Sequence, residues 1–243
     1  ALMPSDPGRL LDTFSGVGTI PFEARLAGHT AFGFDISPAA IAISRGKLEQ
    51  VDWSVVDDIL EQLAAYVSGK KARVKLAPLS TIRFNGPLAD YFHPDTLKEI
   101  VAARRFFLEN RPESGAGAII MASLLHILHG NRPYALSRRS HPITPFAPTG
   151  PTEYRSLIER LYKKVDRCRV AAEGIPDTQS ISFAQDVTKT WPEQVSNLDA
   201  IITSPPFFDS TRFHTANWMR LWFAGWDPSD FSKRPANFVD EKQ

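Results

Sequence analysis

Cysteine, net charge and long apolar runs are all scarce in this chain of 243 residues. Its single cysteine, Cys168, excludes a disulfide framework and suits the reducing environment of the cytoplasm. The formal net charge of +1 gives no overall sign of a nucleic-acid-binding protein. The longest apolar run, 116–128, is too short to cross a membrane, and we see no signal peptide, repeat or low-complexity tract. We therefore expect a cytoplasmic protein with no membrane partner.

What the sequence does contain is enough apolar material for one α/β domain, since 43% of its residues are hydrophobic. Residues 9–28 predict a strand that ends at Asp12, a turn with Gly16 and Gly18, and a helix over 19–28. The glycines allow a tight turn and let a ligand approach the backbone at a helix N-terminus, which favours a carboxylate.

A second strand, 30–34, ends at another acid, Asp35, which is typical of a residue that binds ribose hydroxyls. The turn lacks the third glycine of the dinucleotide fingerprint, and Asp12 would repel a pyrophosphate. A cationic sulfonium would be attracted by the same acid. The pattern therefore favours S-adenosylmethionine over NAD, with an ordinary strand–turn–helix as the alternative.

Near the other end, an apolar strand over 198–202 leads into Ser204, Pro205, Pro206 and Phe207. Two prolines cannot continue a central strand, so we expect a rigid, exposed tip at its carboxyl end. Such a tip offers a hydroxyl, unpaired carbonyl oxygens and an aromatic ring. These groups can hold an exocyclic amino group while the ring stacks on the base that carries it.

Taken together, the two motifs resemble those of the DNA amino-methyltransferases, which methylate N4 of cytosine or N6 of adenine. The similarity covers residues 9–48 and 181–226. The leading Ser204 is more similar to the cytosine-N4 branch, and Asp186 resembles the acid that contacts the adenine of the cofactor. The resemblance implies that the cofactor S-adenosylmethionine is bound by Asp12, Phe14, Ser15, Gly16, Gly18, Thr19, Asp35, Ile36 and Asp186, and that catalysis involves Ser204, Pro205, Pro206 and Phe207.

Between the two motifs lies a long segment that does not continue a strand–helix alternation. Periodicity predicts helices over 52–68, 96–110, 116–129 and 152–173, with a loop over 130–151. We therefore divide the chain into a cofactor-binding half (1–50), a helical insertion that contacts DNA (51–178) and a part with the third and catalytic strands and a following helix over 215–225 (179–243).

The insertion carries a local excess of positive charge. From 132 to 169 the chain has nine basic and three acidic side chains, a balance of +6. This composition suits phosphate contacts, and the alternative is a solvated helix face. We expect DNA contacts from Arg132, Arg138, Arg139 and His141. His126 and His129 are interpreted as packing residues rather than metal ligands.

The fold class expected is α/β, a Rossmann-like methyltransferase sheet that is incomplete at its C-terminal end. The resemblance implies further strands after the catalytic strand, so we expect a second chain or a missing C-terminal segment to complete the sheet. Cys168 lies in a predicted basic helix and not at a strand tip, which disfavours carbon-5 methylation. Three alternatives stay open: a tRNA guanine-N2 methyltransferase, a protein glutamine methyltransferase, and a catalytically incomplete nucleic-acid-binding fragment.

Overall fold

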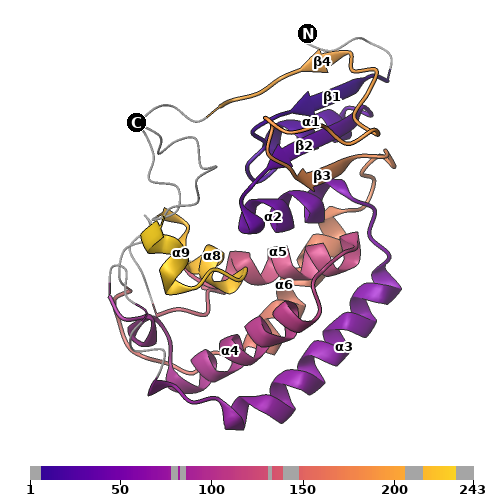
Figure 1. The fold of residues 1–243 in the computed structure, drawn as a ribbon. Coiled ribbons are helices and arrows are strands. Elements are labelled where there is room, and N and C mark those ends of the chain that lie inside the picture. The colour runs from indigo at the N-terminus through magenta and orange to yellow at the C-terminus, as the bar shows by residue number, and fades with distance from the viewer. Residues whose placement is uncertain are drawn as a thin grey trace.

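The protein is an α/β structure built on a sheet of four parallel strands in the order β3-β2-β1-β4 (Figure 1). The computed structural model describes residues 7–77, 82, 86–130, 133–138, 148–205 and 216–233. The strands are β1 (Arg9–Asp12), β2 (Thr30–Asp35), β3 (Ile181–Ala184) and β4 (Ala200–Ile201). The α/β class is confirmed, and this strand order is compatible with a Rossmann-like fold.

The two faces of the sheet are covered in different ways. Leu10 of β1 and Ala31 of β2 pack against helix α1 (Thr19–Leu26), as their shared face of the pleat requires. On the opposite face, Leu11 and its neighbours on β2 pack against Trp191 and Val195. Those two residues belong to the connection between β3 and β4, for which the structure shows no helix.

Strand β4 is short and lies at one side of the sheet. Within the described residues it pairs with β1 alone, through Ala200 and Ile201. The side chain of Ile201 is 53% exposed. The expected second chain or further segment beside this strand stays a prediction.

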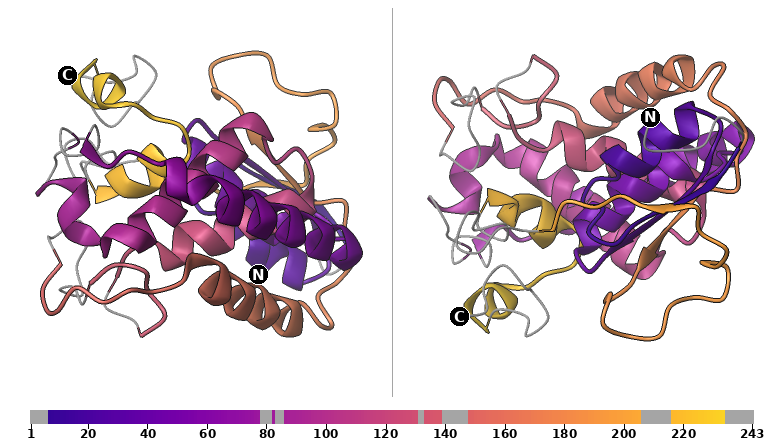
Figure 2. Two further views of the ribbon diagram at one scale, coloured as in Figure 1. Left: turned by 90° about the horizontal axis from the view of Figure 1, so that it is seen from below. Right: turned by 90° about the horizontal axis from the view of Figure 1, so that it is seen from above.

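Helix α2 lies between the sheet and a larger helical layer, which Figure 1 shows below the sheet and Figure 2 shows from two further sides. Helix α2 spans Pro38–Leu48. The helices of the layer are α3 (Trp53–Lys70), α4 (Pro94–Glu109), α5 (Gly115–Ile127), α6 (Leu157–Ala171), α8 (Trp218–Phe223) and α9 (Pro228–Lys233), and its short 3-10 turns are η1 (Lys71–Arg73) and η3 (Leu88–Tyr91).

The predicted helix over 52–68 is confirmed as α3, and its sequence explains it. Asp52 caps the helix, because its Oδ1 accepts a 2.9 Å hydrogen bond from the Ser54 amide. Val56, Leu60 and Leu63 recur at helical spacing and are all buried. The helix therefore presents one apolar stripe to the layer.

Helices α2 and α5 approach each other closely because small residues line their contact. A Cβ placed on Gly46 of α2 would come within 3.1 Å of the Ala118 carbonyl oxygen and 3.2 Å of the Ala122 methyl carbon on α5. This contact joins the sheet half of the molecule to the helical layer.

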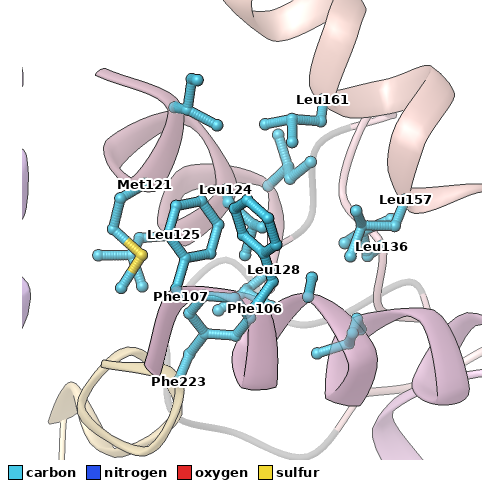
Figure 3. Close-up of a cluster of buried hydrophobic side chains, with 14 of the residues drawn as sticks. Phe106, Phe107, Met121, Leu124, Leu125, Leu128, Leu136, Leu157, Leu161 and Phe223 are labelled. Atoms are coloured by element: carbon cyan, nitrogen blue, oxygen red, sulfur yellow. The ribbon is translucent and has the colours of Figure 1, made fainter. Parts of the chain in front are cut away.

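The core of the helical layer is one continuous apolar cluster (Figure 3). Phe106 and Phe107 of α4 meet Leu124 and Leu125 of α5 there, and Phe223 of α8 closes one side. The rings of Phe107 and Phe223 lie edge to face, with centroids 6.1 Å apart. Helix α8, which follows the catalytic motif in sequence, thus packs into the insertion, and the core crosses the boundary expected at residue 178.

The helix predicted from residue 152 begins later, at Leu157. Residues 152–155 are not helical, and Ser156 is the N-cap. A tertiary contact adds to this cap, because the buried carboxylate of Glu99 on α4 accepts a 2.9 Å hydrogen bond from the Leu157 amide. Glu99 also accepts hydrogen bonds from Lys71 at 2.9 Å and from the Tyr154 hydroxyl at 2.8 Å.

Candidate functional site

The carboxyl ends of four parallel strands bring the two sequence motifs to one edge of the sheet. Asp12 ends β1, Asp35 ends β2, Asp186 follows β3 by two residues, and Ser204 follows β4 by three. Ligands of open parallel sheets bind outside such carboxyl ends. The structure therefore places these predicted residues on the edge where a ligand is expected.

The glycine turn between β1 and α1 folds back onto β2. The amide and hydroxyl of Ser15 both donate to the Phe34 carbonyl oxygen, at 2.9 and 3.1 Å. The Gly18 amide closes the turn by donating to the Ser15 carbonyl oxygen at 2.7 Å. Gly18, not Thr19, is the N-cap of α1, and Thr19 is exposed as the first residue of the helix. Because the cap has no side chain, no side-chain oxygen occupies this helix N-terminus.

The two glycines of this turn serve different purposes. Both have positive φ, 51° at Gly16 and 73° at Gly18, so both need a residue without a Cβ. A Cβ on Gly16 would face open space, with no atom within 4 Å. A Cβ on Gly18 would lie 2.4 Å from the Ser44 Oγ of α2. Gly16 thus leaves room for a ligand, whereas Gly18 is required for helix packing.

Asp35 binds the turn itself. Its Oδ2 accepts a 2.9 Å hydrogen bond from the Gly16 amide, and its Oδ1 accepts one of 2.8 Å from the Ser37 amide. Each carboxylate oxygen can accept a second hydrogen bond, so ribose hydroxyls stay within its capacity. Burial raises the pKa of Asp35 above its ordinary value, and the nearby charge of Asp12 raises it further, against the lowering effect of these amides.

Asp12 connects the glycine turn to the Ser-Pro-Pro-Phe motif. It is 2% exposed, and its Oδ1 accepts hydrogen bonds from the Phe14 amide at 3.0 Å and from the Thr203 Oγ1 at 2.7 Å. The Thr13 hydroxyl also donates to the Thr203 Oγ1, at 3.2 Å. Burial raises the pKa of Asp12, although both hydrogen bonds to its carboxylate act in the other direction.

Thr203 is the residue that the sequence analysis missed. The sequence feature that could have indicated it is a hydroxyl side chain one position before the Ser-Pro-Pro-Phe motif. Ser204 and Pro205 follow it and are exposed, as the proline pair predicted. Pro206 and Phe207 lie outside the described residues. The bond between Thr203 and Asp12 fixes the start of the motif against the glycine turn.

Asp186 lies near the carboxyl edge of the sheet, where its side chain stabilises its own turn. Its Oδ1 accepts hydrogen bonds from the amide and the hydroxyl of Thr188, at 2.9 and 2.7 Å. The preceding residue, Gln185, donates its amide to the Asp35 carbonyl oxygen at 3.0 Å. Phe14 and Ile36 are both half-buried in the segments that follow β1 and β2.

Of the residues predicted to contact DNA, Arg138 lies in the described part of the chain. Its guanidinium donates to the carbonyl oxygens of Gly150 at 2.9 Å and Asp90 at 3.4 Å, and its contact with DNA stays a prediction. Arg132, Arg139 and His141 lie outside the described residues. Arg138 therefore holds the loop against the 3-10 turn η3.

The two histidines proposed as packing residues both contact aromatic rings. His126 stacks on Tyr134, with centroids 5.5 Å apart, and His129 lies edge to face with Tyr91 at 5.1 Å. Among the residues that the structure describes, no cluster of three or more His, Cys, Asp or Glu side chains is placed to hold a metal ion.

Comparison with known proteins adds no further evidence on the site. No protein-family model, curated protein or solved structure matches this chain significantly. Over the described part of the chain, no helix combines the length and the apolar character needed to cross a bilayer.

Proposed function

We propose that this protein is an S-adenosylmethionine-dependent DNA amino-methyltransferase that favours N4 of cytosine over N6 of adenine. The observation that carries the proposal is the hydrogen bond from Thr203 to Asp12, which joins the two motifs across adjacent strands. The two residues are 191 positions apart in the sequence, so the fold brings them into contact and neither motif alone predicts it. We propose with it that the parallel sheet is that of a Rossmann-like methyltransferase fold.

The chemistry of the edge fits the proposed cofactor. The open space beside Gly16 admits a ligand, and the uncapped N-terminus of α1 favours a carboxylate. Asp12 and Asp35 lie close enough for the charge of one to raise the pKa of the other, so the edge favours a cation over a pyrophosphate. When bound, S-adenosylmethionine would supply a methyl group on a sulfonium.

The residues after β4 would position the amino group. The Ser204 Oγ and the Pro205 carbonyl oxygen would accept hydrogen bonds from the amino hydrogens, which directs the nitrogen lone pair toward the methyl group. Phe207 would stack on the base, which must be flipped out of the duplex at a cost of a few kcal/mol. The amino proton can leave after the nitrogen–carbon bond forms, so no strong base is required. Positioning would then supply much of the acceleration.

The deciding experiment is nucleoside mass spectrometry after incubation with S-adenosylmethionine and either duplex DNA or tRNA. We expect N4-methylcytosine in the DNA, and N6-methyladenine would move the target base within the same class. Methylated guanine in tRNA alone would replace the DNA assignment by an RNA one. Absence of any methylated nucleoside together with no S-adenosylmethionine binding in calorimetry would refute the proposal.

A matched pair of variants tests the role of Ser204. Ser204→Ala should abolish methyl transfer while leaving S-adenosylmethionine affinity nearly unchanged. Ser196→Ala is the control, because Ser196 is equally exposed but precedes β4, at the opposite end of the strand. Equal activity in the two variants would contradict the assigned role.

A further inference from the structure

Part of the basic stretch 132–169 lines a hollow on the outer side of α6, which lies at the periphery of the helical layer in both views of Figure 2. We call this the α6 hollow. Its volume is about 690 Å³, and its lining includes five basic and two acidic side chains. The basic residues are Arg155, Arg160, Lys163, Lys164 and Arg167, and the acids are Glu159 and Asp166.

Two of these arginines are fixed in place by backbone carbonyl oxygens. Arg160 donates to the Pro133 carbonyl oxygen at 2.6 Å, and Arg155 donates to the Ala135 carbonyl oxygen at 2.8 Å. Carbonyl oxygens are neutral, so both guanidiniums keep their full charge. Among the described residues, Arg155 forms an ion pair with the exposed Glu153, at 3.8 Å, which is a weak pairing. Burial lowers the pKa of Arg160 and the charge of Arg155 lowers it further, whereas the charges of Glu159 and Glu153 raise it.

The other three basic side chains of the α6 hollow differ in their partners. The Arg167 guanidinium lies 5.5 Å from the centroid of Tyr134, a ring that is itself stacked on His126. Lys164 has no ion pair within the described residues. Lys163 pairs with Glu159, but both side chains are more than 60% exposed, so water weakens this pair.

The spacing of the cations indicates a polymer rather than a single small anion. Arg160, Lys163, Lys164 and Arg167 lie within eight residues of one helix, and the first and last are about 10 Å apart along its axis. One strand of duplex DNA advances about 3.4 Å per phosphate along its own axis, so the row matches about three phosphates.

We propose that the α6 hollow binds the phosphodiester backbone of the DNA duplex, through Lys164 and Arg167 with Arg155 and Arg160 as the fixed positive floor. This inference rests on the proposed function for the choice of DNA as the polymer. It adds residues on α6 to the contact predicted for the loop residue Arg138. Contacts of this kind position a duplex and carry no sequence information.

The test is fluorescence anisotropy of a labelled duplex of arbitrary sequence, titrated with the full chain across a series of salt concentrations. The variant is Lys164→Gln with Arg167→Gln. The control is Lys189→Gln with Arg111→Gln, which removes the same two residue types from exposed positions on other elements. Each lost phosphate contact should reduce the slope of log affinity against log salt by about 0.9, and should weaken binding about eightfold near 0.1 M salt.

The expected result is therefore a slope smaller by about 2 and a loss of well over tenfold in the α6 variant, with the control close to the unaltered protein. Equal slopes in variant and control would overturn the inference, as would absence of duplex binding or binding to RNA alone. Methyl transfer to DNA with equal slopes would leave the proposed function standing without this surface. Salt-dependent binding through α6 without any methyl transfer would do the reverse.

Discussion

Replacing Gly18 by alanine should destabilise the fold far more than the same change at Gly16, two residues away in the same turn. The added Cβ at Gly18 would meet Ser44 of α2 at three atoms: Oγ at 2.4 Å, Cβ at 3.0 Å and Cα at 3.2 Å. Rotating the hydroxyl relieves the first contact and leaves the other two. Ser44 is fully buried, so α2 itself would have to move.

The loss in the free energy of unfolding has two contributions that are common to Gly16→Ala and Gly18→Ala, and a third that applies to Gly18→Ala alone. Both glycines have left-handed φ, which costs alanine about 1–2 kcal/mol. Both substitutions recover about 0.4–1 kcal/mol by restricting the unfolded chain. Overpacking adds about 1–3 kcal/mol at Gly18 alone. We therefore expect Gly18→Ala to lower the free energy of unfolding by about 1–3 kcal/mol more than Gly16→Ala does.

Urea unfolding followed by circular dichroism measures this difference. A double variant sharpens the test, because Ser44→Gly removes two of the three contacting atoms. Gly18→Ala should then cost less in the Ser44→Gly background than in the unaltered one. If the two alanine variants prove equally stable, or the double variant shows no coupling, the assignment of Gly18 to helix packing is wrong.

Three further predictions concern polar side chains that form hydrogen bonds within the fold. Burial raises the pKa of Asp12, so its contribution to the free energy of unfolding should fall as the pH rises above its ordinary pKa of 3.8. In urea unfolding, the stability of Asp12→Asn relative to the unaltered protein should therefore increase with pH above 3.8. A difference between the two proteins that does not change with pH would contradict this. Glu99→Ala should cost about 1–3 kcal/mol in the same assay, since it leaves the Leu157 amide without its acceptor, and a cost within error of zero would argue against that contact. Thr203→Val should slow methyl transfer about 10–100-fold while S-adenosylmethionine affinity in calorimetry stays within about twofold, because it removes a hydrogen bond to a carboxylate. Thr203→Ser should restore the rate, and a valine variant as fast as the unaltered protein would show that the bond does not position the motif.

Much of the fold could be predicted because its signals are local. The stripe of Val56, Leu60 and Leu63 sets a helical period, and the acid and glycines around Gly16 define a turn between a strand and a helix. Both patterns depend on residues close in sequence, and the elements they predict are confirmed as α3 and as β1, α1 and β2.

The remaining features depend on contacts between distant segments, which no local pattern records. The first amide of helix α6 is bound by Glu99 on another helix, in addition to the local cap from Ser156. Arg138 belongs to a basic loop in sequence, yet its guanidinium donates to carbonyl oxygens of the fold. Thr203 became part of the site through Asp12, which stands on the neighbouring strand. In the same way, Gly18 is defined less by its turn than by Ser44 on α2.

The position of α2 has a consequence for how such a chain could be inherited or engineered. Its residues Ala39 and Ala42 belong to the core of the helical layer, Gly46 rests on α5, and the other side of the helix contacts β2 and β3. A cassette exchange that removed residues 51–178 would expose an apolar helix face to water. The insertion can therefore be lost or replaced only together with compensating changes in α2. We expect the sheet and the helical layer to be kept together when the gene is inherited or engineered.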